Sequence, residues 1–337
     1  MNPAGYKTEL LPWLEKEYSQ LINLESSSKL AHAYLFGGQL GLGKLMLAMH
    51  FGHYLLCSSK QNDQPCLSCR DCELFLAGSH PDLRLIQPED SNEIKIEQVR
   101  NTIEFITQTS QRGGYKVVIF RPAEAMNTNS ANALLKVLEE PAQNTLIILV
   151  SHQPALLMAT IRSRCHAVKF NRPSAEKVIP WLEAKNIYAS PAELLRMANN
   201  IPLRALQYAD DEALQDRTVL HGVMEKLLSG EMDISLAAKS CEDFSLQDNI
   251  EGMLLCTSDI LAHVQASSGN NQSSLHDHDH DFQHLAKHFQ SRTTLQALHE
   301  FYRELLQAKR AALSTSNPNP ALVVETLFYH WAQTARG

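Results

Sequence analysis

The stretch that decides the fold is GQLGLGKL, residues 38–45, which separates two segments of different periodicity. Before it, residues 33–36 form a short apolar run that is typical of a buried strand, and after it residues 44–56 follow a helical pattern. A glycine-rich turn between a strand and a helix is the setting of a phosphate-binding loop, whose backbone N–H groups approach phosphate oxygens. The residues that fit this pattern are Gly38, Gly41, Gly43 and Lys44.

The position after the lysine departs from the pattern. A working site carries a hydroxyl there to hold Mg²⁺, whereas this chain has Leu45, and an alkyl side chain cannot ligate a hard cation. The loop is therefore either a degenerate nucleotide site, in which ATP binding is in doubt, or a strand-to-helix turn that binds no nucleotide. Both interpretations predict the same fold.

A second departure follows the apolar run at residues 116–120, which we interpret as a buried strand. An ATPase of this type needs an acidic residue for the metal and another to orient water. Here Arg121 and Pro122 occupy these positions, and Glu124 comes too late along the chain to replace them. Two independent losses predict that the chain does not hydrolyse ATP.

The alternation of segments predicts the fold class. Residues 129–140 have a helical pattern that stops at Pro141, and residues 145–150 form another buried strand. Strands that alternate with helices indicate a parallel sheet covered on both faces.

The pattern becomes helical from about residue 174, with short helices expected at 174–185, 191–199 and 202–208. We expect an α/β part followed by all-α parts, divided as residues 1–172, 173–210 and 211–337.

Four of the seven cysteines fall within one short segment, with the spacing C-x8-C-x2-C-x2-C: Cys57, Cys66, Cys69 and Cys72. Four thiolates are a preferred cage for a structural Zn²⁺, which predicts a zinc module at about residues 57–80. An iron–sulfur cluster is the weaker alternative, and four unrelated buried thiols is another. His80 is expected to serve a turn or packing role, and the remaining cysteines are expected to be small buried side chains.

Ser163, Arg164 and Cys165 place an arginine between two small residues near the expected domain edge. A rigidly held guanidinium can stabilise charge on a phosphoryl group that belongs to another subunit. A surface salt bridge is the commoner role for such an arginine, and Arg162 carries the same charge.

The composition excludes several classes of protein. Hydrophobic residues make up 44% and charged residues 20%, and the net charge of −7 gives no overall attraction to nucleic acid. The longest apolar run, residues 146–150, is too short to cross a membrane, and residues 1–5 show no signal peptide, so we expect a cytoplasmic protein.

Together these motifs resemble the clamp-loader branch of the AAA+ ATPases. The resemblance spans nearly the whole chain and is weakest between about residues 210 and 290. It rests on the cysteine module after the loop helix, on GSHPD at 78–82, on NSANALLKVLEEP at 129–141, on SRC at 163–165, and on the helix start at 319–320 with Leu322, Glu325, Leu327 and Trp331.

The resemblance implies a P-loop AAA+ domain, a small three-helix lid domain and a C-terminal helical collar domain. It further implies a stationary, non-catalytic member of a five-subunit ring, beside motor subunits of the gamma/tau type and a delta-type subunit. Through that ring the chain would meet the sliding clamp and primed DNA, and Arg164 of the SRC motif would reach a neighbour's ATP site.

Two alternatives stay open. The chain could be an active AAA+ motor with unusual motifs, or a DNA-binding module whose cysteine cluster is the reader. The run at residues 276–281, HDHDHD, is expected to be a solvated turn rather than a metal site, and Arg204 lies one residue out of register with the family's second sensor arginine.

Overall fold

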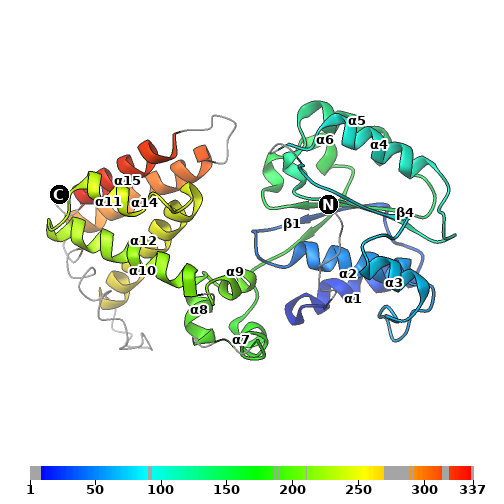
Figure 1. Ribbon diagram of the computed structural model, residues 1–337, viewed down its shortest axis with the longest axis horizontal. Helices are drawn as coiled ribbons and strands as arrows, with labels where there is room; N and C mark the ends of the chain where they lie inside the picture. The colour runs from blue at the N-terminus through cyan, green and yellow to red at the C-terminus, as the bar shows by residue number, and fades with distance from the viewer. Residues whose placement is uncertain are drawn as a thin grey trace. The chain divides into compact units, whose positions relative to one another are not determined.

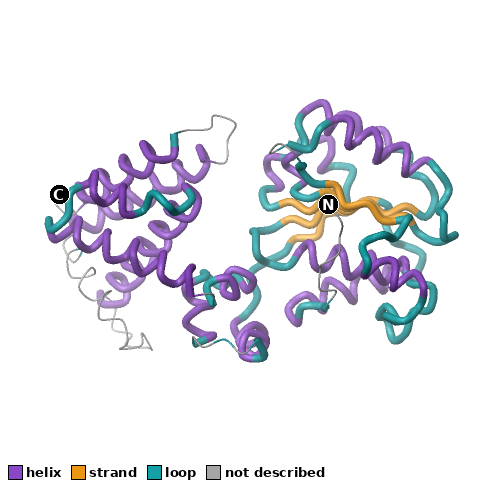
Figure 2. Tube along the Cα trace, viewed as in Figure 1, coloured by secondary structure: helices purple, strands orange, loops and turns teal. Residues whose placement is uncertain are grey.

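A computed structural model describes residues 9–89, 93–185, 187, 190–209, 211–268, 289, 292–312 and 319–334. The chain divides into two compact units, Met1–Leu206 and Gln207–Gly337, which we call unit 1 and unit 2. Figures 1 and 2 show an α/β arrangement in unit 1 and an all-helical arrangement in unit 2.

Unit 1 is built on a five-stranded parallel sheet with the strand order β2-β3-β4-β1-β5. The three inner strands are buried along their whole length, as expected of a parallel sheet covered on both faces. The predicted parallel sheet is therefore confirmed. The strands are β1 (Ala33–Gly37), β2 (Leu83–Ile86), β3 (Lys116–Phe120), β4 (Thr145–Ser151) and β5 (His166–Lys169).

Helices cover both faces of this sheet (Figure 1). One face carries α4 (Ile96–Thr107), α5 (Thr128–Glu139) and α6 (Ala159–Arg162), and alternate strand residues such as Val118 and Ile147 pack in their core. The other face carries α1 (Glu15–Ser26), α2 (Lys44–Leu56) and α3 (Arg70–Leu76). Short 3₁₀ helices lie at Pro12–Leu14, Ala123–Ala125 and Pro154–Leu156.

Helix α5 shows how local sequence sets the element boundaries that matter for the site. Asn127 caps its start, because the side-chain oxygen accepts the backbone N–H of Ser130 at 3.0 Å. Apolar residues at helical spacing, among them Leu134 and Leu138, face the core. Pro141 cannot continue a helix, and α5 ends at Glu139.

The three short helices expected after residue 173 are present as α7 (Ala175–Glu183), α8 (Pro191–Met197) and α9 (Pro202–Gln207). We call them the lid helices.

Unit 2 packs its helices around one apolar core, which includes Met253, Phe301 and Trp331. The Trp331 indole N–H donates to the carbonyl of Met224 at 2.9 Å, so its one polar group is satisfied inside the core. The helices are α10 (Asp211–Ser229), α11 (Ile234–Ser240), α12 (Leu246–Ser268), α14 (Arg292–Ala312) and α15 (Pro320–Thr334).

In the described part of the chain, no helix is long and apolar enough to span a membrane. The run at residues 276–281 lies outside the described residues.

Candidate functional sites

The glycine-rich loop lies between β1 and α2, as the sequence predicts. Gly41 and Gly43 have φ values of 86° and 87°, a left-handed conformation that side chains rarely adopt. A Cβ at Gly43 would come within 2.4 Å of Leu11 Cδ1, and one at Gly41 within 2.5 Å of Ile201 Cγ2. The loop therefore needs these glycines for its own packing, whether or not a phosphate binds.

Lys44 is buried in the loop, with 3% of its surface exposed. Its Nζ donates to the backbone carbonyls of Gly38 at 2.6 Å and Gln39 at 2.5 Å. Desolvation lowers the pKa of Lys44 to about 8, although the nearby Glu124 carboxylate opposes this shift. The ammonium group thus binds two carbonyl groups of its own loop and stabilises the loop conformation.

A pocket of about 450 Å³ opens beside the loop, within the size range of small-molecule sites. Its walls include Lys44, Leu45, Arg121 and His152. Leu45 and Arg121, the two departures identified from the sequence, therefore lie at the same pocket. A leucine and a guanidinium stand at the two positions where a magnesium-dependent site of this kind needs a hydroxyl and a carboxylate.

Glu124 has a structural role in this region. Its Oε1 accepts the backbone N–H groups of His152 at 2.8 Å and Gln153 at 3.2 Å, which ties the end of β3 to the segment after β4. Burial lowers the pKa of His152 to about 4, and Lys44 and Arg121 add to this shift while Glu124 opposes it. The imidazole is therefore neutral at physiological pH.

Protein groups also hold the loop from two sides. The Trp13 indole N–H donates to the carbonyl of Leu42 at 3.1 Å, and the backbone N–H of Leu203 in α9 donates to the carbonyl of Gly41 at 3.1 Å. Trp13 and Trp181 of α7 meet edge to face, with ring centroids 5.0 Å apart. The lid helices thus contact the loop directly, through the backbone of Leu203.

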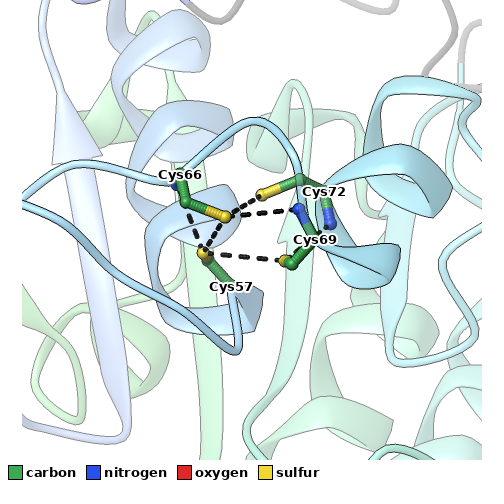
Figure 3. A group of neighbouring side chains, drawn as sticks. All are labelled: Cys57, Cys66, Cys69 and Cys72. Atoms are coloured by element: carbon green, nitrogen blue, oxygen red, sulfur yellow. Dashed lines mark hydrogen bonds between the residues drawn. The ribbon is translucent and has the colours of Figure 1, made fainter.

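The four clustered cysteines come together at the junction of α2 and α3 (Figure 3). Their Sγ atoms all lie within 4.8 Å of one another, and the pairs that approach most closely are 3.6 to 3.9 Å apart. Tetrahedral Zn²⁺ with Zn–S bonds of about 2.3 Å separates its sulfurs by about 3.8 Å. The residues present therefore fit a four-thiolate metal site, and the set is Cys57, Cys66, Cys69 and Cys72.

Backbone N–H groups point at these sulfurs. Cys66 donates to the Sγ of Cys57 at 3.3 Å, Cys69 to that of Cys66 at 3.3 Å, and Cys72 to that of Cys69 at 3.4 Å. Such donors stabilise negative charge on sulfur, which is the state that binds a metal. His80 lies outside this set, and its Nδ1 accepts the backbone N–H of Asp82 at 3.1 Å.

Partly buried polar contacts join the cysteine module to the rest of unit 1. Asp71, between two of the cysteines, accepts from Arg112 Nε at 2.6 Å. On the other side, the Tyr18 hydroxyl of α1 donates to the carbonyl of Asp63 at 2.5 Å. The module is therefore fixed to two separate parts of the α/β unit.

Arg164 lies just after α6, at the edge of the sheet that β5 forms. Its Nε donates to Glu139 Oε1 at 2.8 Å, its Nη2 lies 2.5 Å from the same oxygen, and its Nη1 donates to the carbonyl of Thr160 at 2.9 Å. The side chain is one-third exposed, at 34%. The guanidinium of Arg164 is fixed by these hydrogen bonds and is still partly exposed, so it can contact a group on another molecule.

The two neighbours of Arg164 anchor the motif. The Ser163 hydroxyl donates to the carbonyl of Thr160 at 3.1 Å, and Cys165 is buried in the core cluster that contains Val137 and Ile161. Cys241 and Cys256 are also buried, as expected.

A parallel sheet with a glycine-rich loop after its first strand, followed by lid helices on that loop, defines a P-loop fold of the AAA+ type. Comparison with known families identifies the branch. Residues 13–174 match the family model described as "DNA polymerase III, delta subunit", and residues 211–333 match the model "DNA polymerase III, delta subunit, C terminal".

Curated relatives agree. The DNA polymerase III subunit delta' of Pseudomonas aeruginosa is 35% identical over 96% of this chain and 98% of its own length. The subunit of the same name from Escherichia coli K12 is 32% identical over 68% of this chain and 70% of its own length. The chain belongs to the family of DNA polymerase III delta' subunits.

Among solved structures, a DNA polymerase III gamma subunit-related protein from Thermotoga maritima is 19% identical, with a TM-score of 0.48. The match covers 94% of this chain and all of that one.

Sequence reasoning missed the partners of the predicted residues. Glu139 was predicted to lie in a helix but was given no role, although it contacts Arg164, which lies 25 residues away in the sequence. Trp13 carried no motif, yet its indole binds the loop. No local pattern reports such contacts, because they depend on how distant elements pack.

Proposed function

We propose that this chain is a non-catalytic subunit of the DNA polymerase III clamp loader, which helps to load the sliding clamp onto primed DNA during replication. It assembles with motor subunits of the gamma/tau type and a delta-type subunit in a five-membered ring. It contributes no ATP turnover of its own, and it supplies Arg164 to the ATP site of the adjacent motor.

The observation that carries this proposal is the contrast between two sites on one unit. The pocket beside the glycine loop has Leu45 and Arg121 where magnesium-dependent hydrolysis needs ligands, whereas Arg164 is held at the surface by its neighbours. Hydrolysis by this chain is therefore disfavoured, and a contribution to a neighbour's hydrolysis is favoured. The family membership makes a ring of related subunits the setting for that contribution.

The metal in the four-cysteine cage is proposed to be Zn²⁺ with a structural role. Four thiolates fill its tetrahedral coordination and leave no open position for a substrate. The contacts of Asp71 and Tyr18 indicate what the module stabilises, namely the packing of α1 and α3 against the α/β unit. We also retain the division into an AAA+ domain (1–172), a lid domain (173–210) and a collar domain (211–337).

The test compares ATP turnover by three samples: the isolated chain, the other loader subunits without it, and the complete reconstituted loader with clamp and primed DNA. The isolated chain should be inert with magnesium, and its addition to the other subunits should raise turnover. Hydrolysis by the isolated chain would favour the alternative of an active motor. Salt-dependent DNA binding by the isolated chain, lost when the cysteines are replaced, would favour the DNA-reader alternative.

A further inference from the structure

The Glu139 carboxylate occupies an unfavourable place for a negative charge. It is the last residue of α5, where the aligned peptide dipoles already concentrate partial negative charge. Its side chain is half exposed, at 51%, so the carboxylate is not required to fill the core. The contact that offsets this position is the one with Arg164.

The atoms involved define the geometry of the pair. Glu139 Oε1 binds the edge of the guanidinium formed by Nε and Nη2, and the carbonyl of Thr160 takes an N–H of Nη1. A guanidinium carries five N–H donors in a fixed plane. The carboxylate therefore fixes the plane by one edge, and N–H groups on the two terminal nitrogens remain for phosphate oxygens.

The surroundings limit movement of the pair. The backbone next to Arg164 is anchored by the burial of Cys165, and Glu139 is fixed by the core packing of Val137 and Leu138 in the same helix. Both ends of the contact thus stand on rigid structure, which is the arrangement that keeps a functional side chain in one orientation.

We propose that Glu139 is a positioning residue for the arginine finger. It holds Arg164 by its Nε edge in the free subunit, so that the terminal nitrogens are already oriented when a neighbouring motor subunit brings its nucleotide. This inference rests on the proposed function, because it assigns to Glu139 the orientation of a residue that acts in trans. Orientation of this kind contributes to the rate of the step rather than to nucleotide binding.

The experiment uses the complete reconstituted loader with clamp and primed DNA. Glu139→Ala should lower kcat for ATP by about tenfold and leave KM for ATP within about twofold, since a guanidinium held only by its Nη1 bond to Thr160 is less often in place. Glu139→Gln keeps an oxygen that can accept from Nε, and it should retain most of the activity. Glu140→Ala is the matched control, because Glu140 is the next residue, carries the same charge and is also exposed.

A double-substitution cycle separates positioning from a general structural effect. In a loader that already carries Arg164→Ala, Glu139→Ala should cause no further loss, because both changes remove the same interaction. Gel filtration of each complex, together with thermal unfolding of each isolated chain, checks that the variants fold and assemble.

Three outcomes would overturn the assignment. In the first, Arg164→Ala lowers turnover but Glu139→Ala has no more effect than Glu140→Ala. In the second, Glu139→Ala raises turnover. In the third, Glu139→Ala lowers turnover by the same factor whether or not the loader also carries Arg164→Ala. A silent Arg164→Ala is a different result, since it would overturn the proposed function itself and the role of Glu139 with it.

Discussion

The pocket beside the glycine loop differs from a magnesium-dependent ATP site in the charge of single residues. Lys44 is retained, but its ammonium group binds the carbonyls of its own loop, and Arg121 brings a positive charge to the pocket in place of a metal-holding carboxylate. Gly43 and Gly41 leave the space into which Leu11 and Ile201 pack. A recognisable loop sequence therefore does not imply a working ATPase.

The first prediction concerns magnesium. Titration of the isolated chain with ADP or ATP should show no gain in affinity when Mg²⁺ is added, because Leu45 and Arg121 offer no ligand for the cation. Calorimetry with and without EDTA measures this directly. A tenfold tighter binding in the presence of Mg²⁺ would contradict the account of the pocket.

The second prediction concerns the Glu124 carboxylate. Glu124→Ala should lower the free energy of unfolding of unit 1 by about 1–3 kcal/mol, because two backbone N–H groups lose their acceptor. Urea denaturation of the variant measures the loss, with Glu140→Ala as the surface control. An effect no larger than that of the control would show that water replaces the carboxylate.

The third prediction is a pH dependence that comes from His152. Its pKa in the folded chain is about 4, against an ordinary value of 6.5, so the unfolded chain binds the proton first as the pH falls. Above pH 6.5 the residue contributes no pH dependence, and between pH 6.5 and 4 it should progressively destabilise the fold. His152→Asn should therefore flatten part of the decline in urea midpoint over this window. Identical slopes for both proteins would be contrary to this expectation.

At the scale of elements, the sequence predicted the helices and strands that are buried and have a regular hydrophobic pattern. The inner strands β1, β3 and β4, the loop helix α2 and the three lid helices lie within two residues of their expected bounds. The two edge strands, β2 and β5, were not predicted from the sequence. Both are short and partly exposed, and polar residues such as Arg84 and His166 interrupt their apolar pattern, so hydrophobic periodicity is a weak signal there.

The candidate sites were predictable to different degrees. The spacing of the four cysteines alone indicated a metal cage, because close spacing in sequence forces closeness in space. The surroundings of Arg164 and of the glycine loop were not predictable, since Glu139 reaches Arg164 and Trp13 reaches Leu42 only through tertiary packing. Short-range chemistry can therefore be inferred from one sequence, whereas the groups that orient it require the fold.

The fourth prediction addresses the cysteine module as an element. The purified chain should contain about one Zn²⁺ per molecule by elemental analysis, and Cys66→Ser with Cys69→Ser should abolish binding. Loss of the metal should also increase hydrogen exchange at Tyr18–Ile22 in α1 and around Arg112, because both regions contact the module. Full occupancy in the double variant would show that these thiols are not ligands.

At the scale of the whole molecule, the chain combines an AAA+-type unit with a separate helical unit, and both match models of the same polymerase subunit family. The features of unit 1 form a consistent set. Its pocket has Leu45 and Arg121 at the two positions where a magnesium-dependent site needs a hydroxyl and a carboxylate, its loop is contacted by the lid helices, and its one-third exposed arginine is held in place. These properties suit the proposed role as a fixed member of a ring that assists hydrolysis at a neighbouring site.

The measurement that tests this account most directly is clamp- and DNA-stimulated ATP turnover by a reconstituted loader whose copy of this chain carries Arg164→Ala, with Arg162→Ala as the control. Arg162 has the same charge and is exposed two residues away. We predict a loss of about a hundredfold or more for Arg164→Ala, as for other arginine fingers, and little change for Arg162→Ala. Equal turnover by the two variants, in complexes that assemble normally, would contradict the claim that this subunit acts through an arginine finger.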